Sequence, residues 1–285
     1  MPAAVQAAVN VFACEPEWAA LASELGGDRL EIYTATTVRQ DPHHIQARPS
    51  LIARARKADL LVCTGAELES GWLPQLLRKA GNARIQPGQP GHFLAAEHLD
   101  LLEIPEKLDR SLGDIHASGN PHVHTDPRNI LQVADPLHRR LTELDPEHAD
   151  IYRQRFDAFT EAWQGAIDRW TQQLAPVKGV AVVVHHNYWS YLVDWTGLDK
   201  IATLEPLPGV SPSSGHLARI KQLLKQQQAV MIIDTGYMND RPAKWLSDQA
   251  GIPLVTLPAT ADFQNNESLY QWFDTLADLI LEPVR

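Results

Sequence analysis

The stretch DPEHADIYRQRFDAFTEAWQGAIDRWTQQL, residues 145–174, decides how the rest of the chain is organised. It opens with Asp145-Pro146, a good helix start, because aspartate is a favoured N-cap and proline is tolerated in the first turn. Apolar side chains then recur at spacings of three and four residues, the period of one helix face. They are Phe156, Phe159, Trp163, Ile167, Trp170 and Leu174. The pattern predicts one helix of roughly 30 residues, about 45 Å long.

A helix of this length exceeds what one small lobe needs, so we interpret it as a rigid rod that spans two lobes. The seam of a coiled-coil dimer is the alternative interpretation. On both sides of the helix, short apolar runs alternate with helical patterns, which is typical of parallel sheets covered by helices. The expected strands are residues 9–13, 30–36, 59–63, 179–184, 229–234 and 253–257.

These patterns predict an α/β fold of two lobes, each a parallel-rich β-sheet flanked by helices, joined by one long interlobe helix. We place the N-terminal lobe at residues 1–144, the connecting helix at 145–175 and the C-terminal lobe at 176–285. The total of 285 residues is enough for two domains of ordinary size. Within the first lobe we expect a helix over 67–80 and a loop-rich segment over 86–120.

The composition argues against several classes of function. Hydrophobic residues make up 44% and charged residues 21%, as in soluble globular proteins, and no apolar run reaches the 18 or so residues of a membrane span. Acidic residues outnumber basic ones by 35 to 25, which argues against a nucleic-acid partner. Residues 1–8 lack the basic region and apolar core of a secretion signal, so the protein is either cytoplasmic or has lost its leader.

The two cysteines do not settle the compartment. Cys14 and Cys63 each lie in or directly after an apolar run. We interpret them as inert buried thiols, with a disulfide or metal ligation as the alternatives.

Histidines gather where predicted strands end. His43-His44 follows the second strand, His185-His186 follows the strand at 180–184, and His122 and His124 lie in the segment GNPHVHTDP. Ligands of open α/β sheets collect at the carboxyl ends of the strands, and neutral imidazole suits Zn²⁺. A single loop histidine is explained by bonds to backbone or water. Three pairs at matching positions favour one zinc site.

The motifs around these histidines resemble those of the substrate-binding proteins of zinc and manganese ABC transporters. They are Asp41-Pro42-His43 with Pro49-Ser50, Pro121-His122 with Asp126-Pro127, and His186 leading Asn187-Tyr188-Trp189-Ser190-Tyr191. The resemblance covers essentially the whole chain. It implies a periplasmic, monomeric, non-enzymatic protein, its leader absent from this chain, that captures Zn²⁺ between its lobes and delivers it to the membrane permease of an ABC transporter.

Carried over position by position, the resemblance makes His43, His122 and His186 metal ligands. A histidine at the last of these positions goes with zinc in the family and a glutamate with manganese, so Mn²⁺ is the less favoured cargo. The family often adds an aspartate just after the last strand. Asp262 arrives a few residues late, and we take it as the fourth ligand, with water, His44 or Glu205 as alternatives.

Zinc-specific relatives commonly carry a long loop rich in histidine before the second motif, and here only residues 114–120 stand in its place. His116 and His124 are candidates for a transient acceptor or a weaker second site, or are simply solvated loop residues.

Two other functions fit some of these observations. Three histidines also suit the catalytic zinc of a hydrolase, but the sequence has no His-Glu-x-x-His helix and no general base placed by a motif. A metal-binding adhesin of the same fold would share the metal site and differ in its partner.

Overall fold

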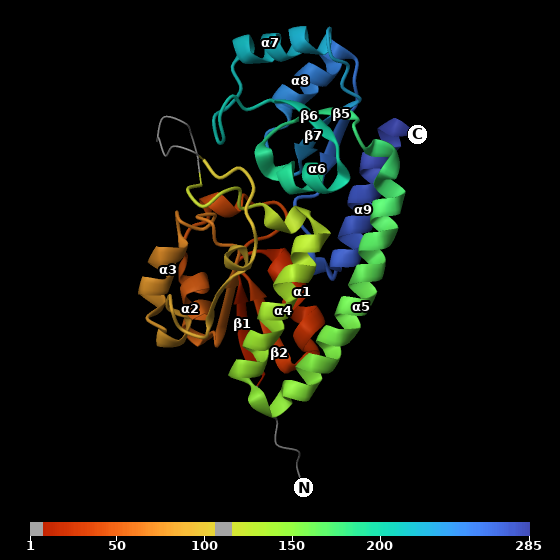
Figure 1. The fold of residues 1–285 in the computed structure, drawn as a ribbon. Helices are drawn as coiled ribbons and strands as arrows, with labels where there is room; N and C mark the ends of the chain where they lie inside the picture. Colours follow the sequence, from red (N-terminus) through yellow and green to blue (C-terminus); the bar gives the residue numbers. More distant parts are fainter. Residues whose placement is uncertain (1–7, 106–115) are drawn as a thin grey trace.

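The computed structural model describes residues 8–105 and 116–285, which form two α/β lobes (Figure 1). Each lobe contains a parallel sheet of four strands, in the orders β2-β1-β3-β4 and β6-β5-β7-β8. The strands are β1 (Val9–Ala13), β2 (Leu30–Thr34), β3 (Leu60–Cys63), β4 (His92–Leu94), β5 (Ala181–Val184), β6 (Asp199–Thr203), β7 (Met231–Thr235) and β8 (Leu254–Leu257). The predicted fold class is confirmed. The interpretation of the first residues as lacking a secretion signal falls on 1–7, outside the described residues.

Nine α-helices accompany these strands in the described part of the chain. They are α1 (Pro16–Gly26), α2 (Pro49–Lys57), α3 (Leu73–Ala80), α4 (Pro127–Leu144), α5 (Ala149–Leu174), α6 (Ser190–Thr196), α7 (Ser214–Leu224), α8 (Arg241–Ala250) and α9 (Leu269–Leu281). Within the described residues, none of them combines the length and apolar character that a membrane crossing requires.

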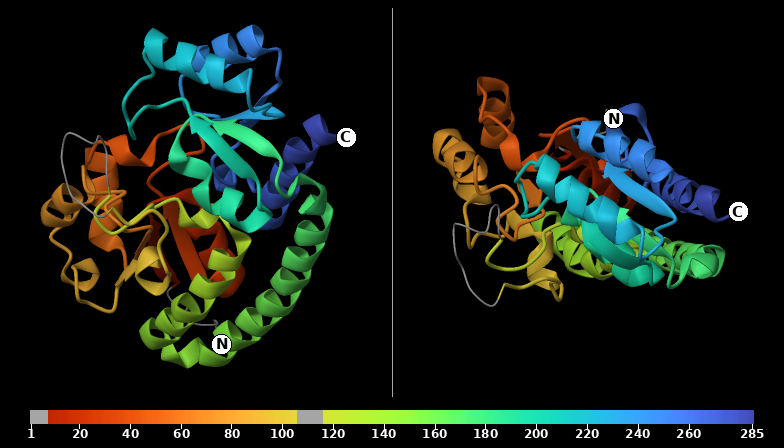
Figure 2. Two further views of the ribbon diagram at one scale, coloured as in Figure 1. Left: turned by 45° about the horizontal axis from the view of Figure 1, so that its top comes forward. Right: turned by 90° about the horizontal axis from the view of Figure 1, so that it is seen from above.

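The long helix predicted from the period of its apolar residues is α5, and it runs for 26 residues between two short 3-10 turns. It packs along α4 and α1 at one end and along α9 at the other (Figures 1 and 2). Its predicted apolar face is buried, except for a half-buried Phe156. The helix therefore touches elements from both halves of the chain.

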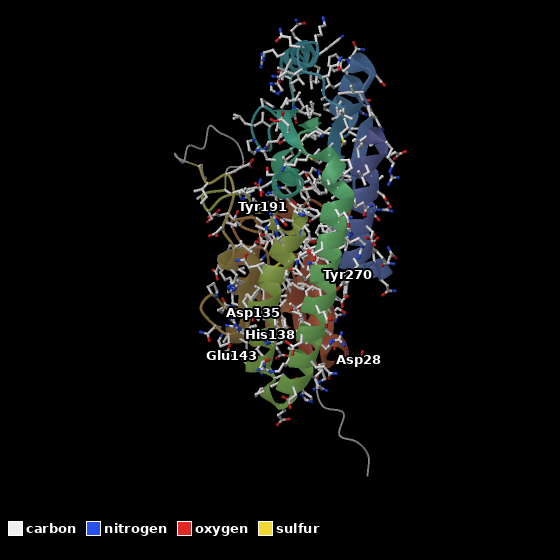
Figure 3. All side chains as sticks on the ribbon, turned by 45° about the vertical axis from the view of Figure 1, so that its right-hand side comes forward. Asp28, Asp135, His138, Glu143, Tyr191 and Tyr270 are labelled. Atoms are coloured by element: carbon white, nitrogen blue, oxygen red, sulfur yellow. A yellow bond between two sulfur atoms is a disulfide. The ribbon has the colours of Figure 1, made fainter. Side chains whose placement is uncertain are left out.

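The hydrophobic core is continuous from one lobe to the other. Trp18 of α1, Trp163 of α5 and Trp272 of α9 are all fully buried in the same cluster. At the junction of the lobes, the hydroxyl of Tyr191 donates to the backbone oxygen of Asn120 at 2.7 Å (Figure 3). The lobes are thus joined by packing as well as by α5.

Two strands escape the sequence analysis, β4 and β6, and both lie at the edge of a sheet. The three residues of β4 fall in the segment expected to be loop-rich, and β6 begins with the polar pair Asp199-Lys200. Edge strands are half-solvated and short, so they carry a weak apolar signal.

The helix expected over 67–80 begins only at Leu73. Residues 64–69 instead form a tight turn in which Gly65, Ala66 and Glu67 have φ values of 80°, 47° and 62°. The Glu69 carboxylate stabilises this turn by accepting the backbone N–H of Thr64 at 2.8 Å and of Gly65 at 3.1 Å. That local bonding competes with helix formation, which explains the late start of α3.

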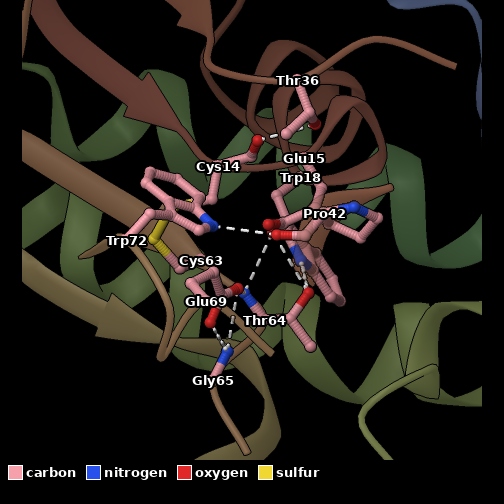
Figure 4. The surroundings of a disulfide bond; sticks show 10 residues. All are labelled: Cys14, Glu15, Trp18, Thr36, Pro42, Cys63, Thr64, Gly65, Glu69 and Trp72. Carbon is pink, nitrogen blue, oxygen red and sulfur yellow. Dashed lines mark hydrogen bonds between the residues drawn. A yellow bond between two sulfur atoms is a disulfide. The ribbon is translucent and has the colours of Figure 1, made fainter. Parts of the chain in front are cut away.

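The interpretation of the cysteines as inert thiols is wrong, because Cys14 and Cys63 form a disulfide (Figure 4). They directly follow Ala13 and Val62, which are register partners in the parallel pair β1 and β3. Their Cα atoms are therefore only 4.8 Å apart, within the range that a disulfide spans. Both residues are fully buried, as expected.

Candidate metal centre

The three histidines assigned as ligands from the sequence come together where the two lobes meet. His43 lies in the 3-10 turn Pro42–His44 beyond β2, His122 directly precedes the turn Val123–Thr125, and His186 follows β5. The ring centroid of His122 is 5.5 Å from that of His43 and 5.5 Å from that of His186. His122 therefore occupies the middle of the group.

Asp41 orients the ring of His43. Its carboxylate caps the 3-10 turn by accepting the backbone N–H of His43 at 3.0 Å, and the same oxygen lies 2.7 Å from Nδ1 of the ring. Burial raises the pKa of Asp41, but its hydrogen bonds with His43 and the charge of that ring lower it below the ordinary value. Because the carboxylate can only accept, the neutral form of the ring carries its hydrogen on Nδ1 and has its lone pair on Nε2.

Glu205 has the same role for His186 in the other lobe. Its Oε2 lies 2.7 Å from Nδ1 of His186 and also accepts the backbone N–H of Gly209 at 2.9 Å. In the neutral ring of His186, as in that of His43, Nε2 then carries the lone pair that can bind a metal ion. A ring hydrogen held by a carboxylate is the usual arrangement behind a metal-binding histidine, and it makes the ring a stronger ligand.

His122 is the buried member of the group. It is 1% exposed, and neither ring nitrogen has a hydrogen-bond partner. Burial, followed by the neighbouring histidines, lowers the pKa of His122 well below its ordinary value. The ring packs against that of Tyr188 at a centroid distance of 4.1 Å. A neutral, fixed and unpartnered imidazole costs free energy unless a ligand satisfies it.

His116 joins the same group, although the sequence indicated it only as a transient acceptor or a weaker second site. Its Nε2 lies 3.2 Å from Nε2 of His43. Burial and then the charge of His43 lower the pKa of His116 to about 4, so the ring is neutral at physiological pH. The sequence signal was a histidine shortly before the second motif, but the spacing alone could not place it beside His43.

The remaining histidines of the three pairs lie elsewhere. His44 is exposed, and its ring centroid is 6.1 Å from that of His43. His185 bonds through Nδ1 to buried Asp234 at 2.7 Å. His124 is buried, with Nδ1 3.3 Å from Glu17 and Nε2 3.0 Å from the hydroxyl of Tyr188. One ring of each pair faces the group. The other is either exposed, as His44 is, or buried in the core, as His124 and His185 are.

Asp262 belongs to a different set of contacts. Its carboxylate accepts a hydrogen bond from the side chain of Asn265 at 2.7 Å, and its backbone N–H donates to Glu267 at 2.6 Å. Glu205 is engaged with His186, as described above. The structure therefore brings the four histidines together and holds Asp262 within its own turn.

The group opens into a cavity of about 400 Å³ between the lobes. His116, His122 and His186 line it, together with Pro121, Leu207 and Pro208. Among the described residues, the ligand atoms of these four histidines do not form a cluster already close enough to hold one ion, so the arrangement is open. Coordination of one ion requires the rings to rotate or the loops to close by a small amount.

A family model described as "Zinc-uptake complex component A periplasmic" matches residues 11–282. The chain belongs to this family. The description of the family names a zinc-uptake complex, and several curated relatives are named as substrate-binding lipoproteins of metal ABC transporters.

Two curated relatives and one solved structure indicate the range of the family. The manganese ABC transporter substrate-binding lipoprotein PsaA of Streptococcus pneumoniae is 21% identical over 82% of this chain and 74% of its own length. The zinc-binding lipoprotein AdcA of the same species is also 21% identical over 82% of this chain, but over 46% of its own length. A crystal structure of ZnuA superposes with a TM-score of 0.80 at 20% identity, covering 96% of this chain and 98% of that one. The relatives are thus named for two different metals.

Proposed function

We propose that this protein captures Zn²⁺ between its lobes and delivers it to the membrane permease of an ABC transporter. The observation that carries the proposal is the buried ring of His122, whose nitrogens have no hydrogen-bond partner. Its centroid lies 5.5 Å from the ring centroids of His43 in one lobe and His186 in the other. Those two rings have their Nδ1 hydrogens bound to carboxylates, so three imidazoles offer free nitrogens to one place.

His43, His122 and His186 are the proposed ligands. The assignment of Asp262 as the fourth ligand stays a prediction. Its carboxylate would first have to give up the hydrogen bond that it accepts from Asn265. Neutral imidazole nitrogens are borderline-soft donors that bind Zn²⁺ well, whereas Mn²⁺ is better matched by carboxylate and water oxygens. This donor set is the reason for proposing zinc as the cargo over manganese.

The disulfide supports a location outside the cytoplasm. Cys14 and Cys63 are bonded, and such bonds persist in oxidising compartments such as the bacterial periplasm. The description of the family also names the periplasm. We therefore propose a periplasmic protein that works as a monomer with its permease.

A hydrolytic role finds less support in the same geometry. A zinc hydrolase needs a general base beside the metal-bound water. The carboxylates of Asp41 and Glu205 are occupied as partners of His43 and His186, on the ring nitrogens that do not face the group. Neither is placed to take a proton from a water on the ion.

The test is metal binding by protein purified without a His-tag. We expect about one Zn²⁺ per chain by mass spectrometry, as one site implies, and a loss of zinc affinity of at least about 10-fold on changing His43, His122 or His186 to alanine. His44→Ala is the matched control, because this ring neighbours His43 but is exposed. Zinc bound equally well by the three variants would overturn the proposed site, and zinc uptake unchanged in cells lacking the protein would overturn the transport role.

A further inference from the structure

Two histidines already stand at the separation of two ligands of one metal ion. Nε2 of His116 is 3.2 Å from Nε2 of His43. Two nitrogens bound to a tetrahedral Zn²⁺ at 2.0–2.1 Å lie about 3.3 Å apart. This pair therefore needs little or no movement to share an ion.

The Nε2 atoms of the two rings face each other. His43 donates its Nδ1 hydrogen to Asp41, which leaves Nε2 without one. The Nε2 atom of His116 is at hydrogen-bond distance from Nε2 of His43, with the direction of the bond set by the tautomers of the two rings. A cation can take the place of the hydrogen between the two nitrogens.

The turn that supports His116 is built for a fixed position. Ala66 and Glu67 both adopt left-handed backbone conformations, which residues other than glycine rarely take. The Glu67 carboxylate accepts the backbone N–H of Ser118 at 3.1 Å and its hydroxyl hydrogen at 2.8 Å. Strained turns persist where surrounding bonds enforce them, commonly at functional sites. Here the strain and the two Ser118 bonds together hold the His116 segment beside His43.

We propose that His116 is the fourth zinc ligand, so that four imidazoles hold the cargo. The inference rests on the proposed zinc-capture function and deepens it. Asp262 competes for the same role, but its carboxylate is bonded to Asn265. Four neutral nitrogen donors leave the full charge of the ion uncompensated and offer no oxygen ligand. Such a site discriminates against Mn²⁺, Ca²⁺ and Mg²⁺, which prefer oxygen.

The experiment uses the full chain with Zn²⁺ alone in competition with a chromophoric chelator, and Co²⁺ alone as a spectroscopic probe of ligand number. His116→Ala should weaken zinc binding by at least about 10-fold. Loss of a residue that only supports a metal ligand already lowers metal affinity by about 10- to 100-fold, and loss of a ligand should cost no less. The visible spectrum of bound Co²⁺ should change in the same variant. His44→Ala, at an exposed ring, is the control and should leave both the affinity and the spectrum as in the parent protein. Asp262→Asn distinguishes the two candidates for the fourth position, and a parent-like affinity and spectrum in this variant would favour His116.

A second variant separates ligation from positioning. Ser118→Ala removes one of the two bonds to Glu67 and should weaken zinc binding while keeping the four-nitrogen Co²⁺ spectrum, with folding checked by circular dichroism. If His116→Ala binds zinc normally while His122→Ala does not, the fourth-ligand inference is wrong and the proposed function stands. If the parent protein and His122→Ala bind zinc equally weakly, the proposed function itself fails. Loss of affinity in Asp262→Asn with none in His116→Ala would return the fourth position to Asp262.

Discussion

The hydroxyl of Thr260 donates to the carboxylate of Glu17 at 2.6 Å, and this bond joins the C-terminal half of the chain to the first turn of α1. Both side chains are buried. Glu17 also lies 3.3 Å from Nδ1 of His124, whose other nitrogen contacts Tyr188, the residue that packs against His122. A chain of buried contacts thus runs between the lobes directly behind the metal site.

Breaking this contact should destabilise the protein. Thr260→Val keeps the shape of the side chain but leaves the buried Glu17 carboxylate without its hydroxyl partner, at an expected cost of about 1–3 kcal/mol of unfolding free energy. Urea denaturation of Thr260→Val, Glu17→Gln and the double variant measures the coupling between the two residues. Strictly additive effects would show that the two side chains do not interact in solution.

The carboxylates behind the metal-binding histidines should control zinc affinity. Asp41→Asn and Glu205→Gln keep the size of each side chain but weaken its hold on the ring hydrogen of His43 or His186. We expect zinc affinity to fall by about 10- to 100-fold in each case. Asp28→Asn is the control, because Asp28 is exposed and lies at the far end of the N-terminal lobe (Figure 3). Affinities equal to that of this control would mean that the carboxylates do not tune the site.

The disulfide should contribute to stability without contributing to metal capture. The bonded cysteines are 49 residues apart in the sequence, and closing a loop of that size constrains the unfolded chain by about 4 kcal/mol. Changing both Cys14 and Cys63 to alanine should lower the unfolding free energy by about that amount, measured with urea under non-reducing conditions. The zinc affinity of the folded variant should be unchanged, and a large loss would link the disulfide to the site.

A buried pair of carboxyl groups should make stability depend on pH. Burial, then the charges of Glu69 and Glu17, raises the pKa of Glu15 well above its ordinary value, and burial raises that of Glu69 to about 7. Folding therefore favours the protonated pair. The unfolded chain binds fewer protons between the ordinary value of 4.5 and about 7, so this contribution is complete below that window and is lost as pH rises through it.

Glu15→Gln tests this, because its amide can donate to Glu69 at every pH. Relative to the parent protein, the unfolding free energy of the variant should increase by about 1–3 kcal/mol from pH 5 to pH 8. Thermal melts across that range measure the difference. A difference that does not vary with pH would show that the pair does not share a proton.

The parts of this molecule that follow from local pattern could be predicted from the sequence. The period of Phe159, Trp163 and Trp170 indicated α5, because one buried face dictates the spacing along a helix. The pairs that contain His43 and His186 could be picked out because they follow strands, where sheets of this type bind ligands. The choice of one ring from each pair came from the resemblance to the family's motifs.

The parts of the molecule that depend on which segments become neighbours in space could not be predicted from the sequence. The Cys14–Cys63 bond requires that β1 and β3 lie side by side, and the sequence does not state the strand order. The place of His116 depends on the left-handed turn at Ala66 and Glu67, whose carboxylate binds Ser118, and no residue type indicates that conformation. Asp262 looked suitable because it lies a few residues after the last strand. In the structure its carboxylate instead accepts a hydrogen bond from Asn265 within a local turn.

The aromatic core that runs through Trp18, Trp163 and Trp272 places side chains of both lobes in one hydrophobic cluster. Trp163 contacts Tyr270 and Phe273 of α9 at centroid distances of 4.7 and 5.6 Å, although more than a hundred residues separate them in the chain. A fragment ending before α9 would leave these large rings facing water. Calorimetry should accordingly show a single melting transition, and neither half, expressed alone, should fold as a soluble domain.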